Sequence, residues 1–152
     1  MQSRIMGMPL AALALSLAAQ TAAAGIVEVE SHRSVAATMD ALEQAVTEAG
    51  LSVAARIDHA AAAAKAGLEL RPEQLLVFGN PKVGTPAMQA DPRAGLFLPL
   101  RVVVYEDAAG RVWLAYEDPA SMMEGLDIPP DAPFLATMTG ALGKFTASAA
   151  GG

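Results

Sequence analysis

Cysteine is absent from the 152-residue sequence. Without a thiol there can be no disulfide, no thiol nucleophile, no cysteine-ligated zinc and no iron–sulfur cluster. A lipoprotein anchor is excluded as well, because it requires a cysteine at the cleavage site. The fold must therefore be held together by core packing alone.

Basic residues are few: ten Lys and Arg stand against sixteen Asp and Glu, which gives a formal net charge of −6. The basic residues form no cluster. An acidic chain of this kind is a poor partner for polyanions and for anionic lipid surfaces. We therefore predict that the protein does not bind nucleic acid.

Ligands for a metal are scarce. His32 and His59 are the two histidines, and they do not form a spacing such as His-x-x-x-His. Of the eight methionines, three lie in the N-terminal segment and Met39 and Met138 on expected core stripes. Met122 and Met123 look available, but core filling explains methionine better than copper binding does. We predict no metal site and no cofactor.

The N-terminal segment has the three parts of a signal peptide. Arg4 supplies the positive charge, Ile5–Ala19 is uncharged and apolar, and Ala22-Ala23-Ala24 matches the small residues at a cleavage site. A membrane anchor is the alternative, but fifteen helical residues span roughly 22 Å against a hydrocarbon core of about 30 Å. We predict cleavage of residues 1–24, a periplasmic or secreted bacterial protein, and no stable membrane span after cleavage.

Residues 25–148 are expected to form one domain, followed by a flexible tail at 149–152. Apolar residues alternate in Ile26–Ser31 and in Leu51–Asp58, which is typical of half-buried strands. Ser34 is a good N-cap for a helix that ends at Gly50 as a left-handed C′ residue. Further elements are expected as a short helix at His59–Ala66, a strand at Gln74–Gly79, strands at Leu100–Glu106 and Arg111–Glu117, and a final helix at about Ala132–Ser148.

Between the third and fourth strands lies the long connection Asn80–Gly95. Thr85-Pro86 resembles an N-cap followed by a first helical residue, so a brief helix is expected inside it. The resulting order is β-α-β-(α)-β-loop-β-β-α. It predicts an α+β fold, with a mostly antiparallel sheet of about five strands and two long helices on one face.

Several short motifs resemble one known family. They are Ile57-Asp58-His59-Ala60, Phe78-Gly79-Asn80-Pro81-Lys82 followed by Gly84-Thr85, Leu98-Pro99-Leu100-Arg101, and Tyr116-Glu117-Asp118-Pro119. Together they resemble the domain of unknown function 302 family, over about Val27 to Ala147. The resemblance implies a small α+β domain with a topology reminiscent of TATA-binding proteins. It implies no reaction and no site residues.

Two segments carry polar residues that chemistry could use. Asp58-His59 lies where a strand gives way to a helix, and is either an acid/base pair or an N-cap with its first-turn residue. Asn80 and Lys82 lie in a glycine-rich turn, but Lys82 precedes Gly84, whereas a phosphate loop needs lysine directly after the second glycine. That turn is either an anion-binding loop or a rigid connection.

The strands also predict an unusual second sheet face. If Leu51, Val53, Ala55 and Ile57 pack under the helices, the opposite face carries Ala54, Val103, Tyr105, Trp113 and Ala115, with Leu76 and Phe78 to be added. Arg56, Asp58, Arg101 and Arg111 lie among them. Such a face is too apolar to be simply hydrated, so the connection, a second subunit or a ligand should cover it.

Three functions remain open from the sequence. The preferred one is a non-enzymatic exported module that homodimerises or binds a small, anionic ligand, with candidate contacts Asp58, His59, Asn80, Lys82, Arg101 and Trp113. The alternatives are an enzyme that uses Asp58 and His59 as acid and base on a small anionic substrate, and a metal or haem carrier. The sequence leaves open whether the protein is an enzyme, with the balance against it.

Overall fold

The computed structural model describes residues 25–151. The predicted signal peptide, residues 1–24, lies outside the described residues. The elements are β1 (Ile26–Ser31), α1 (Val35–Glu48), β2 (Ser52–Asp58), α2 (His59–Lys65), β3 (Glu73–Gly79), α3 (Pro81–Ala90), the 3-10 helix η1 (Pro92–Leu96), β4 (Leu100–Glu106), β5 (Val112–Glu117), α4 (Pro119–Met122) and α5 (Pro133–Ala150).

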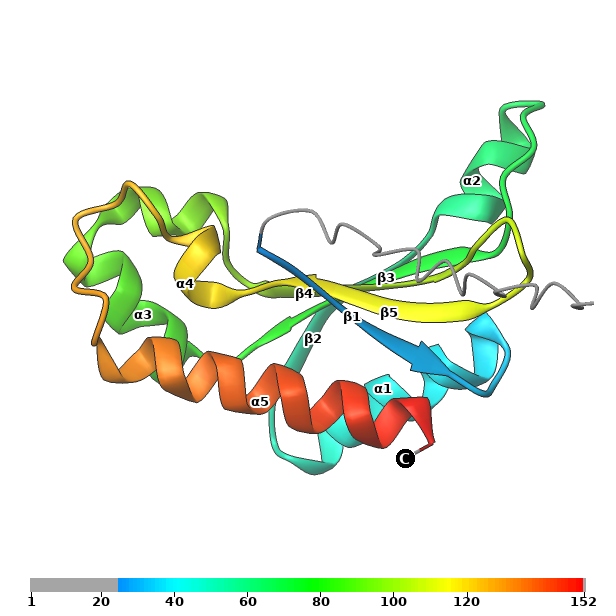
Figure 1. Cartoon of the computed structure of the whole chain (residues 1–152). Coiled ribbons are helices and arrows are strands. Elements are labelled where there is room, and N and C mark those ends of the chain that lie inside the picture. The colour runs from blue at the N-terminus through cyan, green and yellow to red at the C-terminus, as the bar shows by residue number, and fades with distance from the viewer. Residues whose placement is uncertain (1–24, 152) are drawn as a thin grey trace, which may run out of the picture.

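The five strands form one sheet in the order β1-β5-β4-β3-β2, and every neighbouring pair is antiparallel. The two long helices, α1 and α5, lie side by side on one face of it (Figure 1). No described helix covers the centre of the opposite face, which we call the open face (Figure 1). The predicted α+β architecture is confirmed.

The core lies between the sheet and the two helices. Each helix contributes an apolar stripe at helical spacing, and alternate residues of the central strands meet it. Leu42, Met39 and Leu142 are at most 1% exposed, so each of these side chains contributes about 2 kcal/mol by leaving water. The rings of Phe78 and Phe145 meet edge to face, with centroids 6.0 Å apart.

Helix α1 begins and ends as its sequence predicts. The side chain of Ser34 accepts a hydrogen bond from the amide of Ala37, and Gly50 follows the helix with φ of +80°. Glycine adopts this left-handed conformation without steric strain, and the turn leads the chain directly into β2. The helix start, the helix end and the start of the next strand are therefore fixed by local residues.

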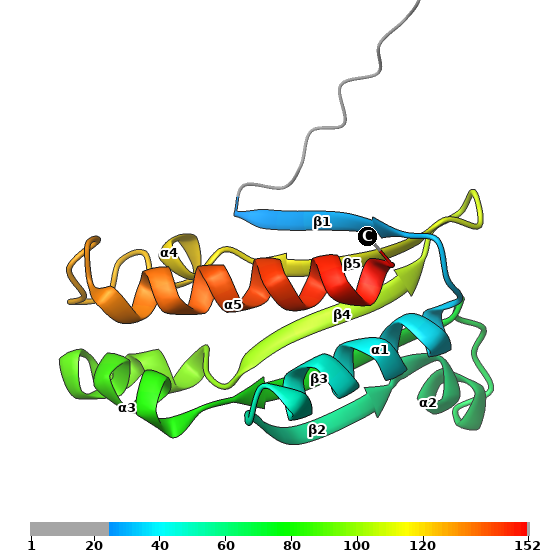
Figure 2. The same cartoon turned by 90° about the horizontal axis from the view of Figure 1, so that it is seen from below.

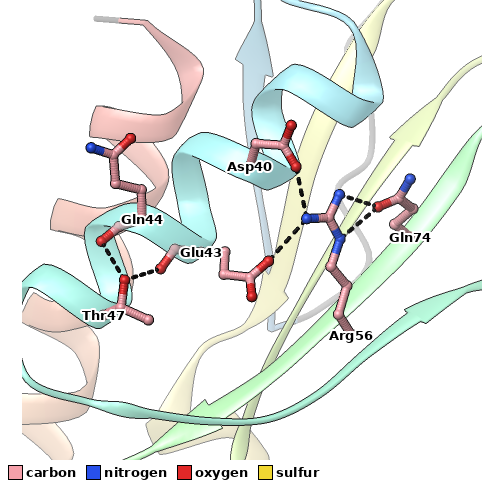
Figure 3. Close-up of polar contacts among 6 residues, drawn as sticks. All are labelled: Asp40, Glu43, Gln44, Thr47, Arg56 and Gln74. Carbon is pink, nitrogen blue, oxygen red and sulfur yellow. Dashed lines mark hydrogen bonds and ion pairs between the residues drawn. The ribbon is translucent and has the colours of Figure 1, made fainter.

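The face predicted for β2 is wrong beyond Val53. A β-bulge between Val53 and Ala55 changes the alternation, so Val53 lies opposite buried Phe78 whereas Ala55 and Ile57 lie opposite Val77 and Leu75 on the open face. As a consequence Arg56 points to the helix side of the sheet. There its guanidinium donates to Asp40 at 2.7 Å and Glu43 at 2.9 Å of α1, and to Gln74 of β3 (Figure 3).

In β3, Leu76 and Phe78 are fully buried under the helices, contrary to the suggestion that they extend the open face. Their neighbours Leu75 and Val77 occupy the open face instead. The strand reads Leu-Leu-Val-Phe, an unbroken apolar run without alternation, so its sequence does not reveal which residues face the core.

The Asn80–Gly95 connection is more helical than predicted. Helix α3 begins at Pro81, five residues before the expected first helical residue Pro86, which lies inside it. The Asn80 side chain accepts from the amide of Lys82 at 3.0 Å and caps the helix. Proline at the first helical position costs no hydrogen bond, so Asn80-Pro81 is itself a start signal.

Beyond α3, Asp91 locks the corner to the 3-10 helix η1. Its buried carboxylate accepts from the side chain and amide of Arg93 and from the amide of Asp127 at 2.9 Å. These bonds hold the pKa of Asp91 well below its usual range. The connection is therefore an ordered helical corner tied to the segment that precedes α5.

At the C-terminus, α5 continues past the predicted end at Ser148. Ala149 and Ala150 are buried residues of its last turn, so the prediction that a flexible tail begins at residue 149 is wrong. Helices α2 and α3 lie at opposite ends of the sheet (Figure 2). This separation decides which of the predicted site residues can meet.

Candidate functional site

Asp58 and His59 form the start of α2. The carboxylate of Asp58 accepts a hydrogen bond of 2.8 Å from the amide of Ala61, which is the bond of a helix N-cap. His59 is the first helical residue and is half-buried. The carboxylate is thus engaged with backbone and not with the imidazole in the described contacts.

Asn80 and Lys82 lie at the other end of the sheet. Asp58 pairs with Gln74 at the start of β3, whereas Gly79, the residue before Asn80, pairs with Ser52. Five residues of extended chain separate the two ends, a distance of roughly 17 Å. The structure therefore does not bring His59 and Lys82 together on one substrate.

Arg101 and Trp113 both occupy the open face, but at different positions. Arg101 pairs with Val77 near the α3 end, and Trp113 pairs with Tyr105 near the β4–β5 hairpin. Their strand positions differ by four residues, or roughly 13 Å. The six predicted contacts are thus distributed over three places: the α2 start, the α3 start and the open face.

A cavity lies between α3 and α5, and we call it the α3–α5 pocket. Its volume is about 380 Å³, within the range of small-ligand sites. The walls come from the ends of β2, β3 and β4, from α3 and from α5. The lining residues are Leu51, Ser52, Ala54, Gly79, Asn80, Pro81, Val83, Gly84, Thr85, Met88, Leu98, Pro99, Leu100, Thr137, Met138 and Ala141.

No charged side chain lines the α3–α5 pocket. Ser52, Asn80, Thr85 and Thr137 are its polar side chains, and the rest of its wall is aliphatic, thioether or backbone. Because an ion would lose its hydration there without a counter-charge, the pocket suits an uncharged molecule with one or two hydrogen-bonding groups. Of the predicted contacts, only Asn80 belongs to it; Lys82 is exposed outside the lining.

A second cavity opens where β4 and β5 part, and we call it the β4–β5 slot. The two strands pair from Glu106–Val112 back to Val103–Ala115, and the pairing stops there. Beyond that point each strand stays with its outer neighbour, β3 or β1, and the two diverge (Figure 2). The slot has a volume of about 240 Å³ and is lined by Ile26, Leu75, Leu100, Arg101, Val103, Ala115, Tyr116, Glu117, Met122 and Leu142.

Near the hairpin, the open face carries a hydrogen-bonded cluster around Asp107. The carboxylate accepts from the amide of Arg111 at 2.9 Å, from the indole of Trp113 at 3.0 Å and from the amide of Ala109 at 2.9 Å. The guanidinium of Arg111 also stacks 5.2 Å from the indole centre. These donors, the Arg111 amide first, lower the pKa of Asp107 to about 2.

Trp113, predicted as a ligand contact, is therefore occupied on its polar edge by the protein's own carboxylate. Since the guanidinium of Arg111 covers one face of the ring, only the other face and the apolar edge remain for a partner. Within residues 25–151, no three His, Cys, Asp or Glu side chains come together in a way that could hold a metal ion.

Both cavities also contain residues that the sequence did not identify. Glu117 lines the slot with Arg101, and counting back from the hydrogen-bonded Asp107–Arg111 pair of the hairpin places these two residues opposite one another. Met138 and Ala141 complete the α3–α5 pocket. The register of α5 against α3 is set by tertiary packing, so no local signal reveals them.

Similar proteins were found at the level of sequence. The fluoride-specific ion channel FluC 1 of Brucella suis is 42% identical over 129 residues, which cover 84% of this chain and 50% of that protein. The protein of the same name from Brucella abortus is also 42% identical over 129 residues, which cover 47% of it. The chain thus spans about half the length of these curated relatives.

A solved structure shares the fold. An uncharacterized conserved DUF302 protein from Bacillus stearothermophilus superposes with a TM-score of 0.67 at 20% identity, covering 85% of this chain and 98% of that one. In the described part of the chain, no helix is both long enough and apolar enough to span a bilayer.

The sequence model of one family, described as a domain of unknown function, matches residues 27–144. This range runs from β1 into α5 and includes all six predicted contacts and, apart from Ile26, the sheet and the lining of both cavities. The resemblance predicted from the short motifs is confirmed, and the chain belongs to the DUF302 family.

Proposed function

We propose that this protein is a non-enzymatic, exported module that binds a small uncharged molecule in the α3–α5 pocket. The observation that carries the proposal is the composition of that pocket: about 380 Å³ bounded by aliphatic and thioether groups, with hydroxyl and amide side chains and no charge. Ligand sites of small proteins commonly combine these features. Export rests on the signal-peptide pattern of residues 1–24.

A binding role accounts for the arrangement better than catalysis does. Acid/base chemistry needs proton-transferring groups within hydrogen-bond reach of one substrate. Asp58 and His59 lie at the opposite end of β2 and β3 from the pocket, and the pocket lining contains no Asp, Glu, His, Lys or Tyr. The polar groups that line it can orient a ligand but have no proton to exchange near neutral pH.

Methionine methyl groups offer a direct test. Met88 and Met138 line the pocket, whereas Met39 is fully buried in the α1 stripe outside it. In protein labelled with [methyl-13C]methionine, cyclohexanol and benzyl alcohol are expected to shift the Met88 and Met138 resonances and to leave Met39 unchanged. Because a ligand of the native state raises its stability, the same probes should raise the thermal midpoint.

A pair of matched variants locates the site. Ala141→Leu adds three carbons to the pocket wall, and Ala136→Leu adds the same three at an exposed position of α5 outside the lining. We expect Ala141→Leu to abolish the methionine shifts and Ala136→Leu to keep them. Shifts that persist in Ala141→Leu, or no response to either alcohol in the unmodified protein, would count against the proposal.

Self-association through the open face is a second candidate function. Ile57 is 40% exposed there beside Leu75, and Val103 on β4 and Trp113 on β5 continue the same face. No described helix covers the centre of this face (Figure 1). An uncovered apolar sheet surface favours contact with a second copy. Light scattering tests it: we expect a dimer that Trp113→Glu converts to a folded monomer, and a monomer at high concentration would contradict it.

The relatives suggest a third context. This chain matches about half of proteins named fluoride-specific ion channels at 42% identity. We propose that the domain works alongside such a channel in this protein as in those relatives. Co-purification with a fluoride channel from the same source is the expected result, and its absence under cross-linking would contradict this association.

A further inference from the structure

We propose that the β4–β5 slot is a second binding site, separate from the α3–α5 pocket, and that it takes a small zwitterion with an aliphatic part, such as a free α-amino acid. The slot presents one cationic and one anionic side chain, Arg101 and Glu117, at the mouth of an otherwise largely apolar cavity.

The parting of the strands holds the two charges apart. Arg101 and Glu117 lie on the same face, two residues beyond the Val103–Ala115 pair. If the ladder continued, they would be direct neighbours. Opposite charges in that position ordinarily form a cross-strand pair. Here no ion pair within 4.0 Å joins them, because β4 follows β3 and β5 follows β1 away from one another.

Four arginines of the described chain form ion pairs, whereas Arg33 and Arg101 form none. Arg56, Arg71, Arg93 and Arg111 each lie within 4.0 Å of a carboxylate of the described chain. Arg101 makes no such contact, and its side chain donates none of the described hydrogen bonds. An unpaired guanidinium beside an apolar cavity is well suited to a carboxylate ligand, which it can bind through two parallel hydrogen bonds.

Glu117 is the anionic side chain of the site. Its carboxylate has no ion pair and no side-chain hydrogen bond among the described residues, and it lines the same cavity. A ligand with a carboxylate alone would meet repulsion from Glu117, and an amine alone would meet repulsion from Arg101. A molecule with both groups satisfies the two side chains at once.

The interior of the slot supplies the apolar contact. Leu75 and Val103 line it from the sheet, and Met122 and Leu142 line it from α4 and α5. Its volume of about 240 Å³ corresponds to roughly eight water molecules, close to the size of a leucine-like zwitterion. Burial of a branched aliphatic side chain there contributes affinity that the exposed charges alone cannot supply.

Calorimetric titration with three isosteric probes tests this assignment. L-Leucine carries both charges, 4-methylpentanoate lacks the ammonium group, and 3-methylbutylamine lacks the carboxylate. We expect leucine to bind the purified protein and each single-charge probe to bind at least tenfold more weakly. Failure of leucine to bind at millimolar concentration, or equal binding of 4-methylpentanoate, would overturn the proposal.

Variants assign the two contacts. Arg101→Gln and Glu117→Gln should each weaken leucine binding at least tenfold, while Arg71→Gln, which removes a paired and exposed arginine, should not change it. Thermal melts of every variant confirm folding. Ala141→Leu in the α3–α5 pocket should leave leucine binding intact, so failure of either site is seen independently of the other.

Discussion

The hydroxyl of Tyr105 on β4 donates a hydrogen bond to Oε1 of Glu28 on β1, across the intervening strand β5. Ala115 of β5 lies directly opposite Glu28, and its small side chain lets the phenol ring reach over the strand. The bond therefore ties the edge strand to the middle of the sheet on the open face. Partial burial and the neighbouring carboxylate raise the pKa of Tyr105 to about 12.

Alkaline conditions should test this bond. The folded pKa of Tyr105, about 12, lies above the ordinary value of 10.0, so the stabilisation is complete below pH 10 and is lost as the pH rises toward 12. For a half-buried phenol we expect a loss of about 1 kcal/mol. Urea unfolding at about pH 8 and about pH 11 measures it, with Tyr105→Phe as the comparison.

The comparison with Tyr105→Phe isolates one group. The pKa of Tyr116 is also raised by burial, and it titrates equally in both proteins. The stability difference between the two proteins should therefore shrink from pH 8 to pH 11. A difference that stays constant over this range would show that the fold, including the bond to Glu28, does not raise the pKa of Tyr105.

The Arg56 clamp allows a prediction about the edge of the sheet. Its guanidinium joins α1 to β2 through two carboxylates and to β3 through Gln74 (Figure 3). Arg56→Gln removes both ion pairs and leaves Asp40 and Glu43 without their shared cation. We expect a loss of about 1 kcal/mol, or a thermal midpoint lower by roughly 4 °C, which decreases in high salt.

Arg71→Gln is the matched control for the clamp. Arg71 makes one contact, 3.6 Å from Glu106, and its side chain is 56% exposed. Exposed single pairs of this kind contribute little to stability, so the midpoint should hardly move. If the two substitutions lower the midpoint equally, the network around Arg56 adds nothing beyond a general charge effect.

Local signals in the sequence were sufficient for most of the fold. Ser34 and Gly50 bound α1, the helical stripes of α1 and α5 identify the face that each buries, and the hairpin between β4 and β5 follows from two alternating runs around Asp107-Ala108-Ala109-Gly110. These features depend on residues close together in the chain. They therefore leave a readable pattern whatever the rest of the molecule does.

The errors lie where no local contrast exists. Ala54 and Ala55 present the same methyl group to either face, so a bulge between Val53 and Ala55 is not visible in the sequence and reverses the assignment of Arg56 and Ile57. The start of α3 was overlooked for another reason. Thr85-Pro86 matches a helix start as well, although the earlier Asn80-Pro81 pair is already a complete start signal.

The candidate sites were less predictable than the fold. Arg101 and Trp113 were identified because a charged or aromatic residue interrupts an apolar strand face. The α3–α5 pocket depends on the packing of α5 against α3, and the slot depends on two strands parting. Both are tertiary relationships between segments that are far apart or that diverge from an ideal ladder.

A buried hydroxyl pair gives a prediction about the core. The side chains of Ser31 on β1 and Thr38 on α1 lie 2.7 Å apart, and both are buried. Thr38→Val leaves the Ser31 hydroxyl with fewer partners and should cost about 1–2 kcal/mol. The double variant Ser31→Ala with Thr38→Val removes both hydroxyls, so it should be nearly as stable as Thr38→Val alone. A double-mutant cycle should give a coupling of about 1 kcal/mol. Strict additivity of the two losses would contradict the pair.

Acid titration of Asp107 provides a local prediction with a built-in probe. The folded pKa of about 2 lies below the ordinary value of 3.8, so the stabilisation is present above pH 4 and is lost as the pH falls toward 2. Trp113, the one tryptophan of the chain, donates to this carboxylate, so its fluorescence should report the protonation directly. We expect a transition in emission centred near pH 2 that precedes or accompanies unfolding.

Asp107→Asn separates this titration from the general effect of acid. The amide retains the size of the carboxylate but accepts with one oxygen only and has no proton to gain in this range. The emission change should therefore disappear in Asp107→Asn, and the stability difference between the two proteins should narrow as the pH falls from about 5 to about 2. Because Asp91 also has a lowered pKa and is present in both proteins, acid sensitivity common to the two comes from groups other than Asp107. A transition near pH 4 in the unmodified protein would mean that the donors around Asp107 do not hold its charge in solution.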